Sequence, residues 1–117
     1  MYSFVSSDMI DEYHRNGVTL IPGLFRPHLK HLRLGVERNM SHPGPYAAEN
    51  LKEGENGRFF DDYCNWNRIP EFKKVVYDTE VCLAAAELMK SNSVQLFHDH
   101  VLVKEPGTSK ETPWHSD

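Results

Sequence analysis

The sequence predicts an α+β fold in which helices come first and strands follow. Between about residues 6 and 90, apolar side chains recur at the spacing of amphipathic helices. From about residue 94, a run rich in Val and Leu and free of Gly and Pro has the composition of a strand. A chain of 117 residues has room for one domain with a modest core, so residues 1–117 are assigned to a single unit.

The first helix is predicted to begin after Ser6 and to stop at Gly17. A serine hydroxyl caps the first free N–H groups of a helix, and a glycine supplies the left-handed residue that ends one. The segment from Val18 to Ile21 is β-branched and aliphatic, and it predicts a short strand that ends at Pro22.

A second helix is predicted to start at Pro27, because proline suits the first helical position. Its apolar stripe is formed by Leu29, Leu32, Val36 and Met40. His28 and His31 flank this stripe, so we expect both on the exposed helix surface.

Residues 41–57 are rich in Gly and Pro and predict a loop, which is long enough for a lid or a substrate-binding role but equally fits a mobile surface excursion. Residues 58–63 then predict a short extended segment. Asp61 and Asp62 are adjacent, so in extended backbone they face opposite sides and cannot act together. We expect both at turn and surface positions.

Two further helices and one strand complete the predicted elements. Pro70 opens a short helix, and Thr79 caps a second one that runs to Lys90. The strand covers residues 94–105, and one of its faces alternates polar and apolar side chains. His98 and His100 lie on that face, which therefore predicts a wet cavity rather than a dry core.

The chain ends on His115-Ser116-Asp117, a His-x-Asp pair. Residues two apart in extended backbone point the same way, so the imidazole and the carboxylate converge. Together they supply two of the three ligands of the facial triad that holds non-haem Fe(II) and leaves positions open for substrate and oxygen.

Three segments, in this order and spacing, carry a resemblance to a known family: residues 17–25, residues 99–108 and residues 112–117. They resemble the N-terminal part of the phytanoyl-CoA dioxygenase family of Fe(II)- and 2-oxoglutarate-dependent oxygenases. The resemblance implies helical support followed by the first strands of a double-stranded β-helix, or jelly roll. In that family the second iron-binding His and the Arg that holds 2-oxoglutarate lie downstream of the His-x-Asp pair. We therefore expect this chain to be a truncated piece that is inactive alone.

The resemblance also implies roles for individual residues. His115 and Asp117 would bind Fe(II), while Arg58, His100 and Trp114 would line the pocket of the cosubstrate 2-oxoglutarate. The expected reaction is hydroxylation of a small organic or acyl substrate by O2.

Three other interpretations remain open. A cupin-type metal site would use His98, His100 and Glu105, although Glu105 falls on the opposite strand face by the period-two rule. A jelly-roll module could bind a ligand without metal or catalysis. In a plain structural domain, His115 and Asp117 would be a surface pair.

Composition narrows the class of partner. The formal net charge is −4 and no cluster of Lys and Arg is visible, which argues against nucleic acid. No run of about eighteen apolar residues predicts a membrane span, and the N-terminus lacks the pattern of a signal peptide. The expected location is the cytoplasm.

Overall fold

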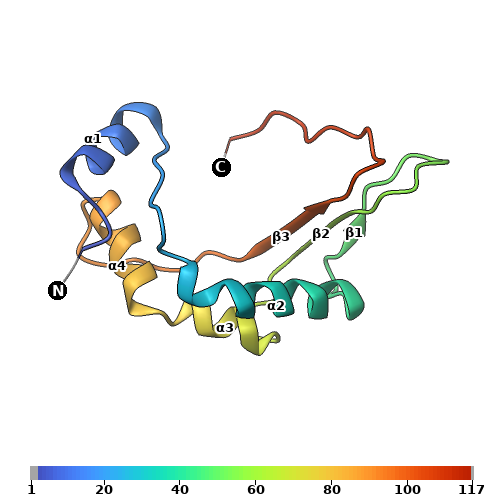
Figure 1. Ribbon diagram of the computed structural model, residues 1–117, viewed down its shortest axis with the longest axis horizontal. Coiled ribbons are helices and arrows are strands. Elements are labelled where there is room, and N and C mark those ends of the chain that lie inside the picture. The colour runs from blue at the N-terminus through green and yellow to red at the C-terminus, as the bar shows by residue number, and fades with distance from the viewer. Residues whose placement is uncertain (1–2, 117) are drawn as a thin grey trace.

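Helices and a small antiparallel sheet form two layers in the computed structural model, which describes residues 3–116. In Figure 1, helices α2 and α3 run side by side beneath the sheet, and α1 and α4 lie together at one end. After the last strand the chain turns back and passes over the side of the sheet away from the helices. The predicted α+β class is confirmed.

Helix α1 (Ser7–Asn16) has the ends that the sequence predicts. The Met9 N–H donates to the Ser6 hydroxyl at 3.3 Å, and Gly17 takes the left-handed conformation at φ 75°. Helix α1 packs against α4 (Thr79–Leu88) around buried Val5, Leu24 and Ala84.

Helix α2 (Leu29–Ser41) follows a short 3-10 turn, η1 (Arg26–His28), and crosses α3 (Pro70–Val76). Gly35 is the point of closest approach, because a Cβ atom added there would overlap the Phe72 ring. Both residues are buried. The absence of a side chain at Gly35 therefore sets how closely these two helices pack.

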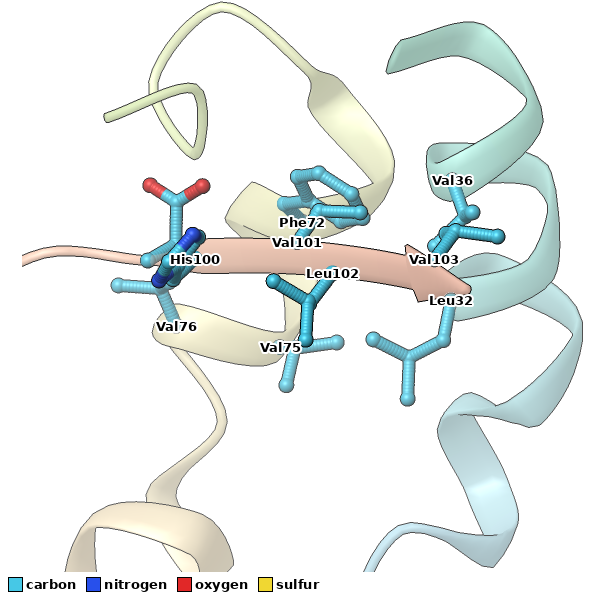
Figure 2. Close-up of a pocket in the computed structure, with 10 residues that line it drawn as sticks. Leu32, Val36, Phe72, Val75, Val76, His100, Val101, Leu102 and Val103 are labelled. Atoms are coloured by element: carbon cyan, nitrogen blue, oxygen red, sulfur yellow. The ribbon is translucent and has the colours of Figure 1, made fainter. Parts of the chain in front are cut away.

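The sheet contains β1 (Ala48–Glu49), β2 (Phe59–Tyr63) and β3 (His100–Lys104), in that order and all antiparallel. One of its faces meets α2 and α3. Figure 2 shows Val101 and Val103 of β3 directed toward Leu32, Val36 and Phe72, around an apolar space of about 330 Å³. This face is the hydrophobic junction between the two layers.

Two predicted strands differ from the structure. The prediction for Val18 to Ile21 is wrong, because no strand within residues 3–116 pairs with this segment. Val18 and Leu20 are exposed, whereas Ile21 packs on the α1–α4 cluster. The strand predicted from residue 94 begins only at His100, because the ladder with β2 reaches from His100 to Lys104 and no further. A strand needs a partner as well as a suitable composition.

The expectation that His28 is exposed is also wrong. The ring is buried, and its Nε2 lies 2.8 Å from Asp78 Oδ2. The other carboxylate oxygen of Asp78 accepts the N–H groups of Glu80 and Val81 at 2.8 and 3.2 Å, so Asp78 rather than Thr79 caps α4. Burial raises the pKa of Asp78, but these hydrogen bonds and His28 outweigh burial and leave the pKa below its usual value.

The contact between Gly35 and Phe72 leads to a stability prediction. Gly35→Ala gains about 1 kcal/mol of helix propensity but forces the Phe72 ring out of its position. Overpacking of this kind costs about 1–3 kcal/mol, so we expect a net loss in the free energy of unfolding. Urea denaturation measures it, with Arg33→Ala on the exposed side of α2 as the control. A more stable Gly35→Ala variant would contradict this account of the helix crossing.

Candidate functional site

The sheet face that points away from the helices carries polar side chains of both β2 and β3. The β2–β3 register pairs Phe59 with Lys104, Asp61 with Leu102 and Tyr63 with His100. Directly opposed residues in an antiparallel pair share one face, so these six side chains lie together. The prediction that His100 looks toward a wet cavity agrees with this arrangement. We call this surface the polar face.

Residues 110–113 pass over the polar face and enclose a pocket of about 280 Å³. The pocket is lined by Asn50, Phe59, Asp61, His100, Leu102 and residues 110–113. Lys104 donates to the Lys110 carbonyl at 2.7 Å and so holds the returning segment close to β3. The predicted return of the chain after the strand therefore places the residues just before His115 on one wall of a pocket.

Asp61 and His100 meet at the floor of this pocket. The distance from His100 Nε2 to Asp61 Oδ1 is 3.5 Å, and Asn50 donates its amide N–H to Asp61 Oδ2 at 2.5 Å. The Asn50 backbone N–H also donates to the Phe59 carbonyl at 2.8 Å, which ties the loop before β2 to that strand. The pocket thus offers an imidazole beside a carboxylate whose second oxygen is already hydrogen-bonded.

The sequence does not predict a site role for two pocket residues, Asp61 and Asn50, or for the neighbouring Tyr46. Asp61 was expected at a turn or surface, which is wrong: it lies within β2 and faces the pocket. Asn50 sits just after β1, a two-residue strand too short to be recognised from composition. Tyr46 precedes β1 and stacks on Tyr63. The alternation within residues 59–63 could have placed Asp61 and Tyr63 on one face, but nothing local marks Asn50 or Tyr46.

Trp114 and His115 follow the pocket wall and are both exposed. His115 Nδ1 lies 2.9 Å from the Pro113 carbonyl oxygen. When that nitrogen carries the proton and donates, the neutral ring has its lone pair on Nε2, the form in which a histidine binds a metal. Asp117, the other predicted ligand, lies outside the described residues.

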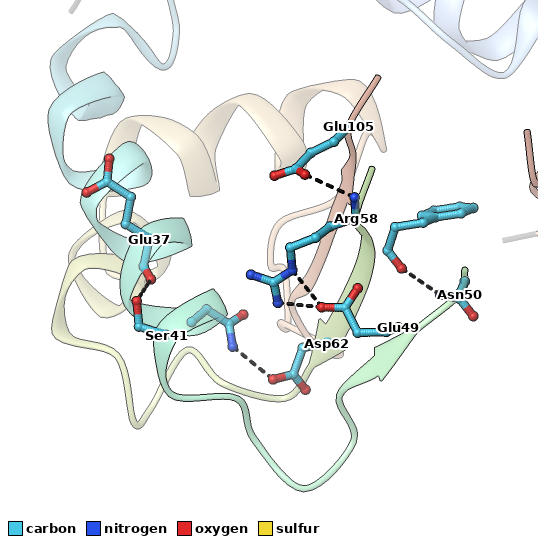
Figure 3. Close-up of polar contacts among 9 residues, drawn as sticks. Glu37, Ser41, Glu49, Asn50, Arg58, Asp62 and Glu105 are labelled. Carbon is cyan, nitrogen blue, oxygen red and sulfur yellow. Dashed lines mark hydrogen bonds and ion pairs between the residues drawn. The ribbon is translucent and has the colours of Figure 1, made fainter. Parts of the chain in front are cut away.

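Arg58 is placed on the opposite side of the sheet from His100. Figure 3 shows its guanidinium paired with Glu49, and its Nε donates to Glu49 Oε1 at 2.7 Å. The guanidinium also lies over the Phe60 ring, 5.2 Å from the ring centroid. The structure therefore does not bring Arg58 to the pocket that contains His100.

The ligand set of a cupin is not assembled among residues 3–116. Glu105 accepts the backbone N–H of Arg58 at 3.0 Å, while His98 and His100 lie on the polar face among aromatic rings. Within this range no group of three or more His, Cys, Asp or Glu side chains is arranged to hold a metal ion. The geometry thus gives no support to a site built from His98, His100 and Glu105.

A buried carboxylate beneath the polar face fixes the loop that borders the site. Asp62 was expected at the surface, which is wrong: it is fully buried. Its Oδ2 accepts the Asn39 amide at 2.8 Å and the Gly44 N–H at 2.7 Å, and the first of these bonds is drawn in Figure 3. A Cβ atom on Gly44 would overlap the Asn65 side chain, so the turn needs glycine here. Burial raises the pKa of Asp62, but hydrogen bonds from Gly44, Asn39, Asn65 and Tyr63 outweigh burial and lower it.

A second set of hydrogen bonds, made by Glu55, joins the same loop to the turn after β3. Glu55 accepts the Ser109 N–H at 2.7 Å, the Ser109 hydroxyl at 2.5 Å and the Thr108 hydroxyl at 3.0 Å. These bonds, led by the one from the Ser109 hydroxyl, lower the pKa of Glu55 to about 2. Asp62 and Glu55 therefore hold the two ends of residues 44–55 against the sheet.

The structure thus combines a two-layer α+β fold with a pocket on the outer face of its sheet. The model of the phytanoyl-CoA dioxygenase (PhyH) family matches residues 13–117. The chain belongs to the phytanoyl-CoA dioxygenase family, which is a family of oxygenases. Neither a curated protein nor a solved structure matches the chain. Within residues 3–116, no helix has the length and apolar character needed to span a membrane.

The Asp62 network predicts how stability depends on pH. Its pKa in the folded chain lies below the ordinary value of 3.8, so the unfolded chain takes up the proton first. The stabilisation is complete well above pH 4 and is lost as the pH falls through the lower, folded pKa.

Asp62→Asn replaces an acceptor by an N–H donor next to other donors, and we expect it to cost about 1–3 kcal/mol at pH 7. The variant should also lose less stability than the wild type between about pH 5 and pH 2. Urea titrations across this range measure both effects, and Glu53→Gln, in the exposed part of the loop, is the control. Parallel acid curves for Asp62→Asn and the wild type would refute the assignment.

Proposed function

We propose that this chain forms part of an Fe(II)- and 2-oxoglutarate-dependent hydroxylase acting on a small organic or acyl substrate. The observation that carries the proposal is the placement of residues 110–113, which lead to His115, over the pocket floored by Asp61 and His100. Family membership across residues 13–117 supports the same chemistry.

The residues present fit an Fe(II) site as far as their chemistry is concerned. His115 supplies an imidazole whose Nδ1 faces a carbonyl oxygen, the usual arrangement behind a metal-bound histidine. Asp117 supplies a hard carboxylate oxygen two residues later. Iron, when bound, would couple the oxidative decarboxylation of 2-oxoglutarate to succinate and CO2 with the insertion of one oxygen atom of O2 into a C–H bond of the substrate.

The chain's own side chains would bind and enclose the reactants. His100 lies on the pocket floor and could donate a hydrogen bond to a carboxylate of 2-oxoglutarate. Trp114, fully exposed beside His115, could cover the cosubstrate and exclude water once a ligand is present. In this proposal O2 and the substrate approach from the open side of the polar face.

The three strands would be the opening part of a jelly roll, which contains about eight strands. The helices α2 and α3 would be the support layer outside that barrel. In the family, the third iron ligand and the arginine that holds 2-oxoglutarate come later in the sequence than the His-x-Asp pair. His115 and Asp117 would supply two of the three protein ligands of the iron.

The proposal is tested by the conversion of 2-oxoglutarate to succinate, in the protein that carries this chain together with the expected downstream residues. His115→Ala or Asp117→Ala should abolish succinate formation, a loss of at least about a thousandfold, because iron loses one of three protein ligands. His42→Ala and Asp11→Ala, at exposed positions on the helical layer, serve as matched controls. Succinate formation that survives both site variants would refute the function.

Arg58→Ala separates a structural role from cosubstrate binding. Since the guanidinium is paired with Glu49 on the helix side, we expect the KM for 2-oxoglutarate to stay within about twofold of the wild type. A half-exposed ion pair of this kind contributes at most about 1 kcal/mol to the free energy of unfolding. Steady-state kinetics and urea denaturation of Arg58→Ala and Glu49→Ala measure the two effects. A tenfold rise in KM for Arg58→Ala alone would instead support the predicted role in binding 2-oxoglutarate.

A further inference from the structure

Four rings in contact form a continuous row on the polar face, and we call Tyr46, Tyr63, His98 and His100 the ring row. Tyr46 stacks on Tyr63 with ring centroids 4.8 Å apart and an angle of 12° between the planes. Tyr63 in turn contacts His98 and His100, with centroid distances of 5.8 and 5.6 Å. His100 belongs both to the ring row and to the pocket floor, so the two are continuous.

The fold holds this row in place from below. Tyr63 and His100 are directly opposed across the β2–β3 ladder. Tyr46 lies two residues beyond Gly44, whose N–H is bound by the buried Asp62 carboxylate. The Ala47 N–H closes the same turn on the Gly44 carbonyl at 3.3 Å. A buried charge and a glycine that tolerates no side chain therefore determine where the Tyr46 ring stands.

The row is open to solvent, with 53% of Tyr46 and 36% of Tyr63 exposed. The carboxylate of Asp61 lies beside the row, with its Oδ1 atom 3.5 Å from His100 Nε2. In the described part of the chain, the basic side chains that lie over rings are Arg58 on Phe60 and Lys104 on Phe59, not on members of the row. The ring row therefore offers flat π faces and hydroxyl and imidazole hydrogen bonds, with no Lys or Arg among its members, whereas Lys104 and Lys110 lie farther along the polar face.

We propose that the ring row binds a planar aromatic ring of the prime substrate, one without phosphate groups, and presents it next to the pocket lined by residues 110–113. This inference rests on the proposed oxygenase function: binding of the ring does not require that function, but hydroxylation of the bound substrate does. Among small organic and acyl substrates it selects flat, unsaturated rings over coenzyme A thioesters. Tyr63 and Tyr46 are the residues that determine this specificity.

Direct binding tests the proposal without iron or 2-oxoglutarate. The probes are indole, cyclohexylmethanol as a non-planar compound of similar size, and octanoyl-CoA as a phosphorylated acyl compound. Binding to the protein that carries this chain is followed by NMR, from the tyrosine ring signals. We expect indole to bind with a Kd of about 1 mM and to shift the signals of Tyr46 and Tyr63. Cyclohexylmethanol should bind at least about fivefold more weakly.

The variants separate stacking from folding. Tyr63→Leu and Tyr46→Leu should each raise the Kd for indole about two- to tenfold, the range typical of a lost aromatic contact. Tyr63→Phe keeps the ring and should bind within about twofold of the wild type. Tyr77→Leu removes a more exposed tyrosine, at the C-terminal end of α3 in the helical layer, and is the control. Tyr46 precedes the strands, so Tyr46→Leu remains informative if Tyr63→Leu does not fold.

Each outcome is decisive. Equal binding of cyclohexylmethanol, tighter binding of octanoyl-CoA at the same tyrosines, or unchanged affinity in Tyr46→Leu would overturn the inference. Succinate formation without any binding of indole would reject the ring row but leave the oxygenase intact. Binding of indole that depends on the tyrosines, without turnover of 2-oxoglutarate, would reject the oxygenase and keep the ring row.

Discussion

The buried carboxylate of Asp62 is the interaction on which the rest of the structure depends. It accepts hydrogen bonds from Asn39 in α2, from Gly44 in the loop and from the backbone of Tyr63. One side chain thereby joins the helical layer, the loop and the sheet. A buried charge is costly unless its oxygens are hydrogen-bonded, so the position of each of these partners is tightly constrained. Asp62, on the opposite side of the sheet, therefore fixes the positions of the residues that form the polar face.

The period of two along β2 and β3 divides the sheet into a structural side and a chemical side. Phe60 and Val103 are opposed on the side that packs against the helices. Asp61 and His100 lie on the other, beneath the returning chain. A shift of one residue in the register would exchange these roles completely. The same rule places Arg58 with Glu49 on the structural side, away from the pocket.

Sequence reasoning succeeded where the signal is local and failed where it depends on distant partners. The ends of α1, the proline that opens α3 and most of β2 follow from short-range preferences, and they are confirmed. The hydrogen bond between His28 and Asp78 joins residues that are fifty positions apart, and no local sequence pattern predicts it. The strand predicted from residue 94 was too long for a related reason, since its composition says nothing of where a partner strand stops.

The residues predicted to carry out the reaction are marked by a local signal, whereas the residues proposed to select the substrate are not. The predicted iron ligands His115 and Asp117 are two residues apart, so a short motif together with the family resemblance predicts the reaction class. The stack of Tyr46 on Tyr63 depends on a turn, a buried carboxylate and a strand register, which a motif cannot record. Residues that select a substrate in this way can change without disturbing the motif. Members of one oxygenase family can therefore share a reaction while their sheet faces select different substrates.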